Sequence, residues 1–132
     1  MTLDTNVVIR IILDDQPTQH QLARELLNSL TAENPAYLSR EVVQECVWVM
    51  ETVKKMTRKQ IASVLWYLLG ISKLRLETPK SLAKCVDRYE HGSHDFSDLM
   101  IQEYAERQGA YPVITFDRKF SQLPGVKLLT TH

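Results

Sequence analysis

Apolar residues follow two alternating patterns along the chain: short runs, and longer stretches in which they recur at helical spacing. The short runs predict strands at residues 36–38, 74–77, 111–115 and 126–128, with residues 2–4 as the end of another. The helical stretches predict helices at residues 6–13, 18–30, 40–54, 57–69, 79–90 and 95–108, with a short helix at 118–122. Short strands that alternate with helices are typical of an α/β sandwich with a mostly parallel central sheet.

Residues that favour helix starts support several of these boundaries. Thr18 with Gln21, and Thr57 with Gln60, have the spacing of a capping box, in which two side chains bond each other's backbone. Asp95 is a good N-cap for the helix over residues 95–108. Because the helix content is high for this fold class, we expect the segment over residues 40–69 to be an added helical hairpin.

Length and composition then limit the classes of protein. The 132 residues, 44% of them hydrophobic, predict one globular domain over residues 1–132. No apolar run approaches the roughly 20 residues of a membrane helix, and no signal peptide is visible. The two cysteines, Cys46 and Cys85, lie far apart and fit neither a disulfide scaffold nor a zinc site, so we expect a reduced cytoplasmic protein.

The net charge changes the picture for nucleic-acid binding. Sixteen basic and sixteen acidic residues cancel, which argues against a broad electrostatic grip on phosphate. A phosphate-bearing partner must therefore be held locally or through a cation.

Two aspartates stand where a predicted strand ends. Asp4 follows the first strand and Asp117 follows the run Val-Ile-Thr at 113–115. Ligands of parallel α/β sheets bind at this carboxyl edge. Each aspartate is equally well explained as the N-cap of the next helix.

Three further acids lie in predicted helices. Glu45 sits among apolar residues of the helix over 40–54, where it needs a partner or a cation if buried, and is simply solvated if it shares a polar stripe with Glu41. Asp95 and Asp98 open the helix over 95–108. Capping and the favourable interaction with the helix dipole are enough to explain Asp95. They explain Asp98 less well, because one acid is sufficient for a cap.

Taken together, these carboxylates predict a cation site. Four or five of them at one edge would raise one another's pKa values unless a cation lay among them. Oxygen ligands select hard ions, Mg²⁺ or Mn²⁺. Such an ion activates water and stabilises charge on a phosphoryl oxygen.

Four segments hold these acids in a specific sequence context. They are Leu-Asp-Thr-Asn-Val-Val at 3–8, Val-Val-Gln-Glu-Cys-Val-Trp-Val-Met at 42–50, Asp-Phe-Ser-Asp-Leu-Met-Ile at 95–101 and Val-Ile-Thr-Phe-Asp-Arg-Lys-Phe at 113–120. They occur in order over nearly the whole chain. Together they resemble PIN-domain ribonucleases of the VapC type, the toxins of bacterial toxin–antitoxin modules. The resemblance implies a three-layer sandwich and an Mg²⁺- or Mn²⁺-dependent endoribonuclease that binds an antitoxin protein and forms a homodimer, for which the hairpin at 40–69 is a sensible interface.

The resemblance also assigns residues. The implied catalytic and metal-binding carboxylates are Asp4, Glu45, Asp98 and Asp117. The positions that it implies for substrate contact or for orienting the carboxylates are Thr5, Asn6, Asp95 and Thr115. Arg118 directly follows Asp117, and we expect it from that position to contact the RNA backbone.

Two other functions stay open from the sequence. The first is an α/β phosphatase with Asp4 as covalent nucleophile, against which stands Asn6, because such phosphatases carry a second Asp there. The second is a non-catalytic PIN-fold interaction module. The complete acidic set argues against it, because a retired site has no reason to keep acids that repel one another.

Overall fold

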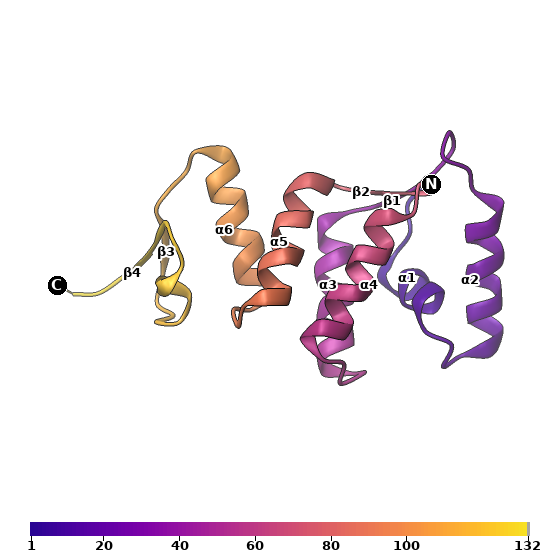
Figure 1. Cartoon of the computed structure of the whole chain (residues 1–132), viewed down its shortest axis with the longest axis horizontal. Helices are drawn as coiled ribbons and strands as arrows, with labels where there is room; N and C mark the ends of the chain where they lie inside the picture. Colours follow the sequence, from indigo (N-terminus) through magenta and orange to yellow (C-terminus); the bar gives the residue numbers. More distant parts are fainter. Residues whose placement is uncertain (132) are drawn as a thin grey trace. The chain divides into compact units, whose positions relative to one another are not determined.

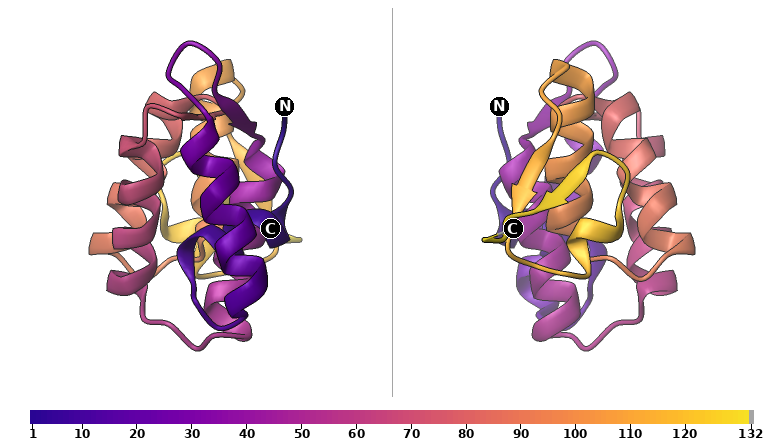
Figure 2. Two further views of the ribbon diagram at one scale, coloured as in Figure 1. Left: turned by 90° about the vertical axis from the view of Figure 1, so that its right-hand side faces the viewer. Right: turned by 90° about the vertical axis from the view of Figure 1, so that its left-hand side faces the viewer.

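The computed structural model describes residues 1–131, which fall into two compact units. The first unit spans residues 1–83 and the second begins at Lys84, so the boundary lies inside a helix. Figures 1 and 2 show the helices and strands of each. A single domain over residues 1–132 stays a prediction.

The first unit contains a two-stranded parallel sheet and four helices, with part of a fifth. Its elements are α1 (Thr5–Ile12), α2 (Pro17–Ser29), β1 (Ala36–Leu38), α3 (Arg40–Thr52), α4 (Arg58–Gly70), β2 (Leu74–Leu76) and the start of α5 (Pro79–His91). Strand β1 pairs with β2, with Ala36 opposite Leu74. The strand expected to end at residues 2–4 is reduced to a single bridge between Thr2 and Tyr37.

Helices α3 and α4 form the expected hairpin and bury one face each (Figure 1). Val43, Val47, Ile61 and Leu65 are all within 1% of complete burial. The Thr57 capping box is confirmed, since Gln60 N–H donates to Thr57 Oγ1 and Thr57 N–H donates to Gln60 Oε1. Burial of these apolar faces sets the position of α3, and the capping box fixes the start of α4.

The predicted capping box of α2 is wrong. The helix begins at Pro17, with Gln16 at the N-cap and no side-chain cap bond, so Thr18 lies inside the first turn. Proline favours the first helical position because its ring fixes φ near the helical value. The N–H that proline lacks would have no partner there in any case, so nothing is lost when α2 begins at Pro17.

The second unit contains the rest of α5 and a second parallel pair of strands. Its elements are α6 (Phe96–Gln108), β3 (Val113–Thr115), a single 3₁₀ turn η1 (Phe120–Gln122) and β4 (Val126–Leu128). The rings of Tyr89 and Phe96 meet edge to face, 5.5 Å apart. Helix α6 ends at Gly109, which adopts a left-handed φ of 65°.

Strand β3 has one bonded edge and one open edge. Val113 N–H donates to Gly125 O, and Leu129 N–H donates to Thr115 O, so both of these β3 residues bond toward β4. In a parallel pair the intervening residue, Ile114, turns its peptide groups the other way. Within residues 1–131, β3 pairs with β4 alone. The Ile114 and Phe116 side chains are 52% and 80% exposed.

The α/β class and parallel pairing are confirmed, and the strands form two short sheets, one in each unit. Among residues 1–131, no helix is long and apolar enough to cross a membrane.

Candidate functional site

Asp4 lies where the Thr2 bridge ends and α1 begins. Leu3 N–H donates to Tyr37 O, which ties the residue before Asp4 to β1. Asp4 is the N-cap of α1, and its Oδ1 accepts from Val7 N–H at 3.1 Å. Asp4 therefore acts as a helix cap and can still bind a ligand. Its carboxylate is exposed, and the second carboxylate oxygen has no hydrogen-bond partner within residues 1–131.

Glu45 lies on α3, which packs against α1, and its side chain is exposed. Burial raises the pKa of the neighbouring Cys46 thiol to about 12, and the negative charges of Glu45 and Asp4 add to this effect. Both carboxylates therefore lie close enough to the buried sulfur to act on its thiol.

The three acids of the second unit also form a group. Asp98 lies in the first turn of α6, with Asp95 at its N-cap position. Burial raises the pKa of the Asp98 carboxyl, and the charges of Asp95 and Asp117 raise it further, while His94 acts in the opposite direction. A group with this pKa shift, caused by burial and like charges, is typical of functional sites.

Short contacts set the positions of these acids. Phe120 N–H donates to Asp117 Oδ1 at 3.1 Å, and Asp117 N–H donates to Thr115 Oγ1 at 3.0 Å, so Asp117 is held at both ends of its turn. Lys119 Nζ donates to Ser93 O at 2.7 Å, which ties that turn to the loop before α6. These bonds hold Asp117 near the start of α6.

Asp95 does not act as its sequence position predicts. It occupies the N-cap position of α6, but its side chain makes no cap hydrogen bond. The negative charge of the Asp95 carboxylate instead raises the pKa of the Asp98 carboxyl. The cap explanation therefore accounts for the position of Asp95 and not for its acid group.

The predicted substrate positions lie beside these acids. Thr5 is buried, whereas Asn6 and Arg118 are exposed. Neither the Asn6 amide nor the Arg118 guanidinium has a recorded polar partner in residues 1–131, so both are available to a ligand. The Thr115 hydroxyl oxygen already accepts a hydrogen bond from the Asp117 N–H.

A divalent cation fits the chemistry of these acids. Within residues 1–131, no three His, Cys, Asp or Glu side chains lie close enough to form a ready-made metal cage. Mg²⁺ does not require one, because it keeps several waters and binds through one or two carboxylates. An ion beside Asp98 would also offset the like charges that raise its pKa.

Two structural features were missed by sequence reasoning. One is a hollow of about 320 Å³ between α1 and α2, lined by Asp4, Asn6 and Gln19 among others. No local sequence pattern predicts this hollow, because it depends on how α1 and α2 pack against each other.

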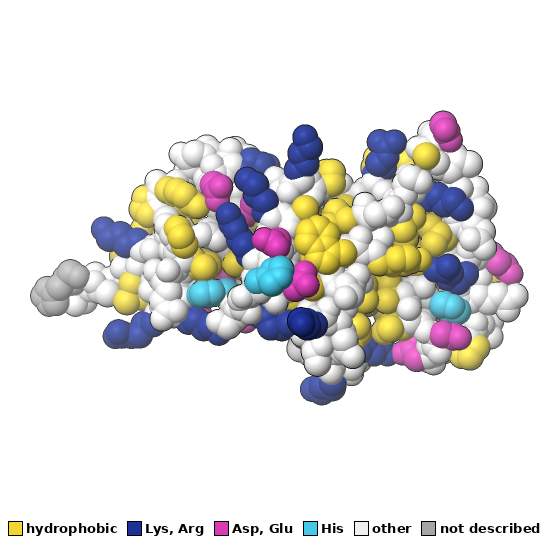
Figure 3. All heavy atoms as spheres, viewed as in Figure 1, with side chains coloured by type: hydrophobic (Ala, Val, Ile, Leu, Met, Phe, Trp, Pro, Cys, Tyr) yellow, Lys and Arg dark blue, Asp and Glu magenta, His cyan; other side chains and the backbone are white. Residues whose placement is uncertain are grey.

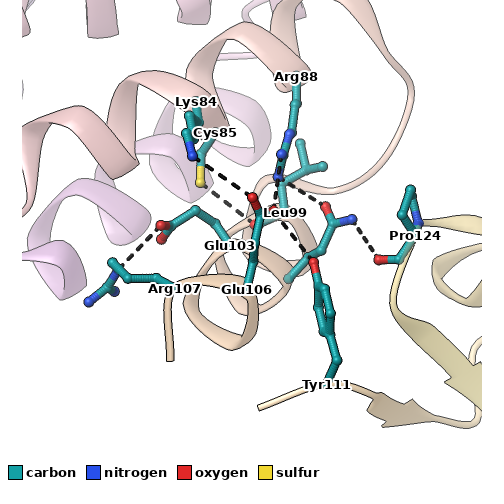
Figure 4. A network of polar contacts seen from close by, with 10 residues as sticks. Lys84, Cys85, Arg88, Leu99, Glu103, Glu106, Arg107, Tyr111 and Pro124 are labelled. Carbon is teal, nitrogen blue, oxygen red and sulfur yellow. Dashed lines mark hydrogen bonds and ion pairs between the residues drawn. The ribbon is translucent and has the colours of Figure 1, made fainter. Parts of the chain in front are cut away.

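The other is a polar network in the second unit (Figure 4). Glu106 contacts Lys84 and Arg88 at 3.8 and 3.3 Å and accepts from Tyr111 Oη at 3.4 Å. Glu103, 2% exposed, pairs with Arg107 at 3.2 Å. The four-residue spacing of Glu103 and Arg107 was the one available signal.

Comparison with known proteins yields one match. The family model described as PIN domain matches residues 1–126, a range that contains all five acids. No curated protein and no solved structure matches the chain.

Proposed function

The chain belongs to the PIN domain family, and from this we propose that it is a metal-dependent endoribonuclease, the toxin of a VapC-type toxin–antitoxin pair. PIN domains are generally nucleases and typically use divalent metal ions. The observation that carries the proposal is the PIN domain match over residues 1–126, a range that contains all five acids. The raised pKa of the Asp98 carboxyl, caused by burial and by the charges of Asp95 and Asp117, supports it. Acids that repel one another are costly to keep together unless a cation joins them.

Asp4, Glu45, Asp98 and Asp117 are the proposed ligands of Mg²⁺ or Mn²⁺, directly or through water. A bound ion would activate water and stabilise charge on the scissile phosphate. The chain's own contribution is positional: the bonds from Val7 and Phe120 hold Asp4 and Asp117 in place before the ion arrives. Asp98 must lose its proton to bind the ion, so cleavage should rise as pH rises through its pKa.

The proposed substrate contacts are Thr5, Asn6, Asp95, Thr115 and Arg118. Arg118 follows Asp117 directly and offers an exposed cation to the RNA backbone. On the face shown in Figure 3, basic side chains are spread among acidic and apolar ones and form no single patch. That distribution agrees with RNA held locally at the acids.

The proposed protein partners are an antitoxin and a second copy of the chain, in the cytoplasm. PIN nucleases often bind an antitoxin. The hairpin of α3 and α4 exposes Trp48, Val53 and Tyr67 by 59%, 58% and 48%. Large exposed apolar side chains on one hairpin support its use as the dimer interface.

An RNA cleavage assay on the purified chain tests the proposal. We would incubate it with total transfer RNA and a messenger RNA in Mg²⁺, in Mn²⁺ and in EDTA. We would compare Asp98→Asn with the control Asp87→Asn, which alters an exposed aspartate of the second unit that pairs with His91.

Cleavage that requires metal, survives in Asp87→Asn and disappears in Asp98→Asn is the expected result. Absence of cleavage by a folded wild type with either ion would leave the interaction module as the better reading. A phosphorylated Asp4 would favour the phosphatase.

A further inference from the structure

The hollow between α1 and α2 opens beside Asp4, the first proposed metal ligand. Its volume is about 320 Å³, and Asn6, Gln19 and Leu22 line it together with Asp4. We propose that this hollow binds a nucleobase of the RNA next to the scissile phosphate, and that Gln19 selects bases with a keto oxygen at C6 of a purine or C4 of a pyrimidine. The inference rests on the proposed ribonuclease function and adds a specificity site to it.

The position of the hollow follows from Asp4. A phosphate held at Asp4 is joined to its base by a single sugar, so that base lies within reach of the walls around Asp4. Single-stranded RNA is recognised in this way, by bases turned away from their neighbours and bonded along their edges.

The walls suit a flat ring. Val7, Leu22 and Leu26 supply apolar surface, and Leu22 is 61% exposed on α2. A base that covers Leu22 removes apolar surface from water while its edge stays free to form hydrogen bonds.

Arg10 fixes the orientation of the Gln19 amide. Arg10 Nε donates to Gln19 Oε1 at 2.8 Å, and Arg10 also pairs with Asp15 at 3.3 Å. Since a guanidinium can only donate, the amide oxygen of Gln19 must face it. The amide N–H₂ group therefore remains as a donor in the wall of the hollow, with no recorded partner among residues 1–131.

This orientation determines which bases fit. A glutamine normally binds adenine with both its oxygen and its nitrogen, but the Gln19 oxygen is already engaged by Arg10. A donor that meets the exocyclic group at purine C6 or pyrimidine C4 favours guanine and uracil, which carry a keto oxygen there. Adenine and cytosine carry an amino group at that position, which donates and cannot accept. Asn6 also lines the hollow and offers both a donor and an acceptor, so it can bond to either kind of base edge.

The experiment maps cleavage sites on an RNA pool of random sequence. The wild type should cut where guanine or uracil occupies one fixed position beside the cut. Gln19→Glu keeps the length of the side chain and its contact with Arg10 but replaces the donor by an acceptor. It should move the preference at that position toward adenine and cytosine, whose amino groups donate.

Gln19→Leu should remove the preference at that position and raise KM about 2- to 10-fold with kcat little changed, as expected for one hydrogen bond. The control is Gln21→Leu on the same helix, where the glutamine bonds Glu25 outside the hollow and its loss should change nothing. Cleavage that continues with the same base preference in Gln19→Glu overturns the proposal and leaves the ribonuclease function intact.

A binding measurement keeps the test independent of cleavage. NMR spectra of the side-chain amides should show the Gln19 and Asn6 signals move when GMP or UMP is added, and move less with AMP. If no mononucleotide moves these signals, the hollow does not bind bases, whether or not the chain cuts RNA. Such a result would make the apolar wall around Leu22 a surface for a protein partner instead.

Discussion

Asp4 has two separable roles, and a pair of substitutions distinguishes them. Its Oδ1 caps α1 through the 3.1 Å bond from Val7 N–H, and its charge is proposed to hold the metal ion. Asp4→Asn keeps an oxygen for the cap and removes the charge. Asp4→Ala removes both.

The expected stability changes follow from the cap. Asn and Asp are nearly equal N-caps, whereas replacing either by Ala costs about 1 kcal/mol, within a range of about 0.5–2. Loss of the charge from the helix N-terminus costs about 0.3–1 kcal/mol. Asp4→Asn should therefore lower the unfolding free energy by about 0.3–1 kcal/mol, and Asp4→Ala by about 1 kcal/mol more.

The assay is thermal unfolding followed by circular dichroism in EDTA, beside RNA cleavage in Mg²⁺. At about 3–5 °C per kcal/mol for a chain of this size, Asp4→Ala should unfold a few degrees below Asp4→Asn. Both variants should lose cleavage, by at least about 100-fold if the charge is needed for the ion. Equal melting of the two variants would refute the cap argument, and cleavage by Asp4→Asn would refute the ligand assignment.

Three further predictions concern other residues. Asp98→Asn should raise Tm at neutral pH, because burial and like charges raise the folded-state pKa and so penalise the ionised carboxylate there. The gain over wild type should shrink as pH falls through that pKa and vanish near pH ~3, below the unfolded value; a gain that grows with acid contradicts the reasoning. Gly125→Ala should lower stability by about 1–3 kcal/mol in denaturant unfolding, because φ is 77° and a Cβ would lie 2.5 Å from the Tyr111 ring. An unchanged midpoint would show that the ring moves freely. Cys46, with a thiol pKa of about 12, should resist iodoacetamide at pH ~8 in the folded chain and react in denaturant, as read by mass spectrometry. Rapid labelling of the native chain would count against its burial.

Local chemistry explains why much of the fold was predictable. The Thr57 capping box and the apolar faces of α3 and α4 specify that hairpin from adjacent residues. The start of α2 was missed by a residue because Pro17 competes with Thr18 for the first turn. The strand expected over residues 111–115 begins only at Val113, since its pairing with β4 determines its length.

For the acids too, local features were predictable from the sequence and tertiary contacts were not. Asp4 and Asp117 were located by the strand before each and the turn after it, which are local features. The influence of Asp117 on the Asp98 carboxyl joins parts of the chain far apart in sequence, and only tertiary packing creates it. The bond between Arg10 and Gln19 likewise depends on the crossing of two helices, which no spacing rule predicts.

The two edges of the β3–β4 sheet differ in how well they resist unwanted association. Lys127 is exposed in the middle of β4, and a lysine on an edge strand discourages another strand from adding there. The β3 edge has no such charge; it presents the peptide of Ile114 and the exposed rings and methyl groups of Ile114 and Phe116. Within the second unit, β3 is therefore the edge to which a further strand can add, and a charged residue in place of Ile114 should reduce such addition.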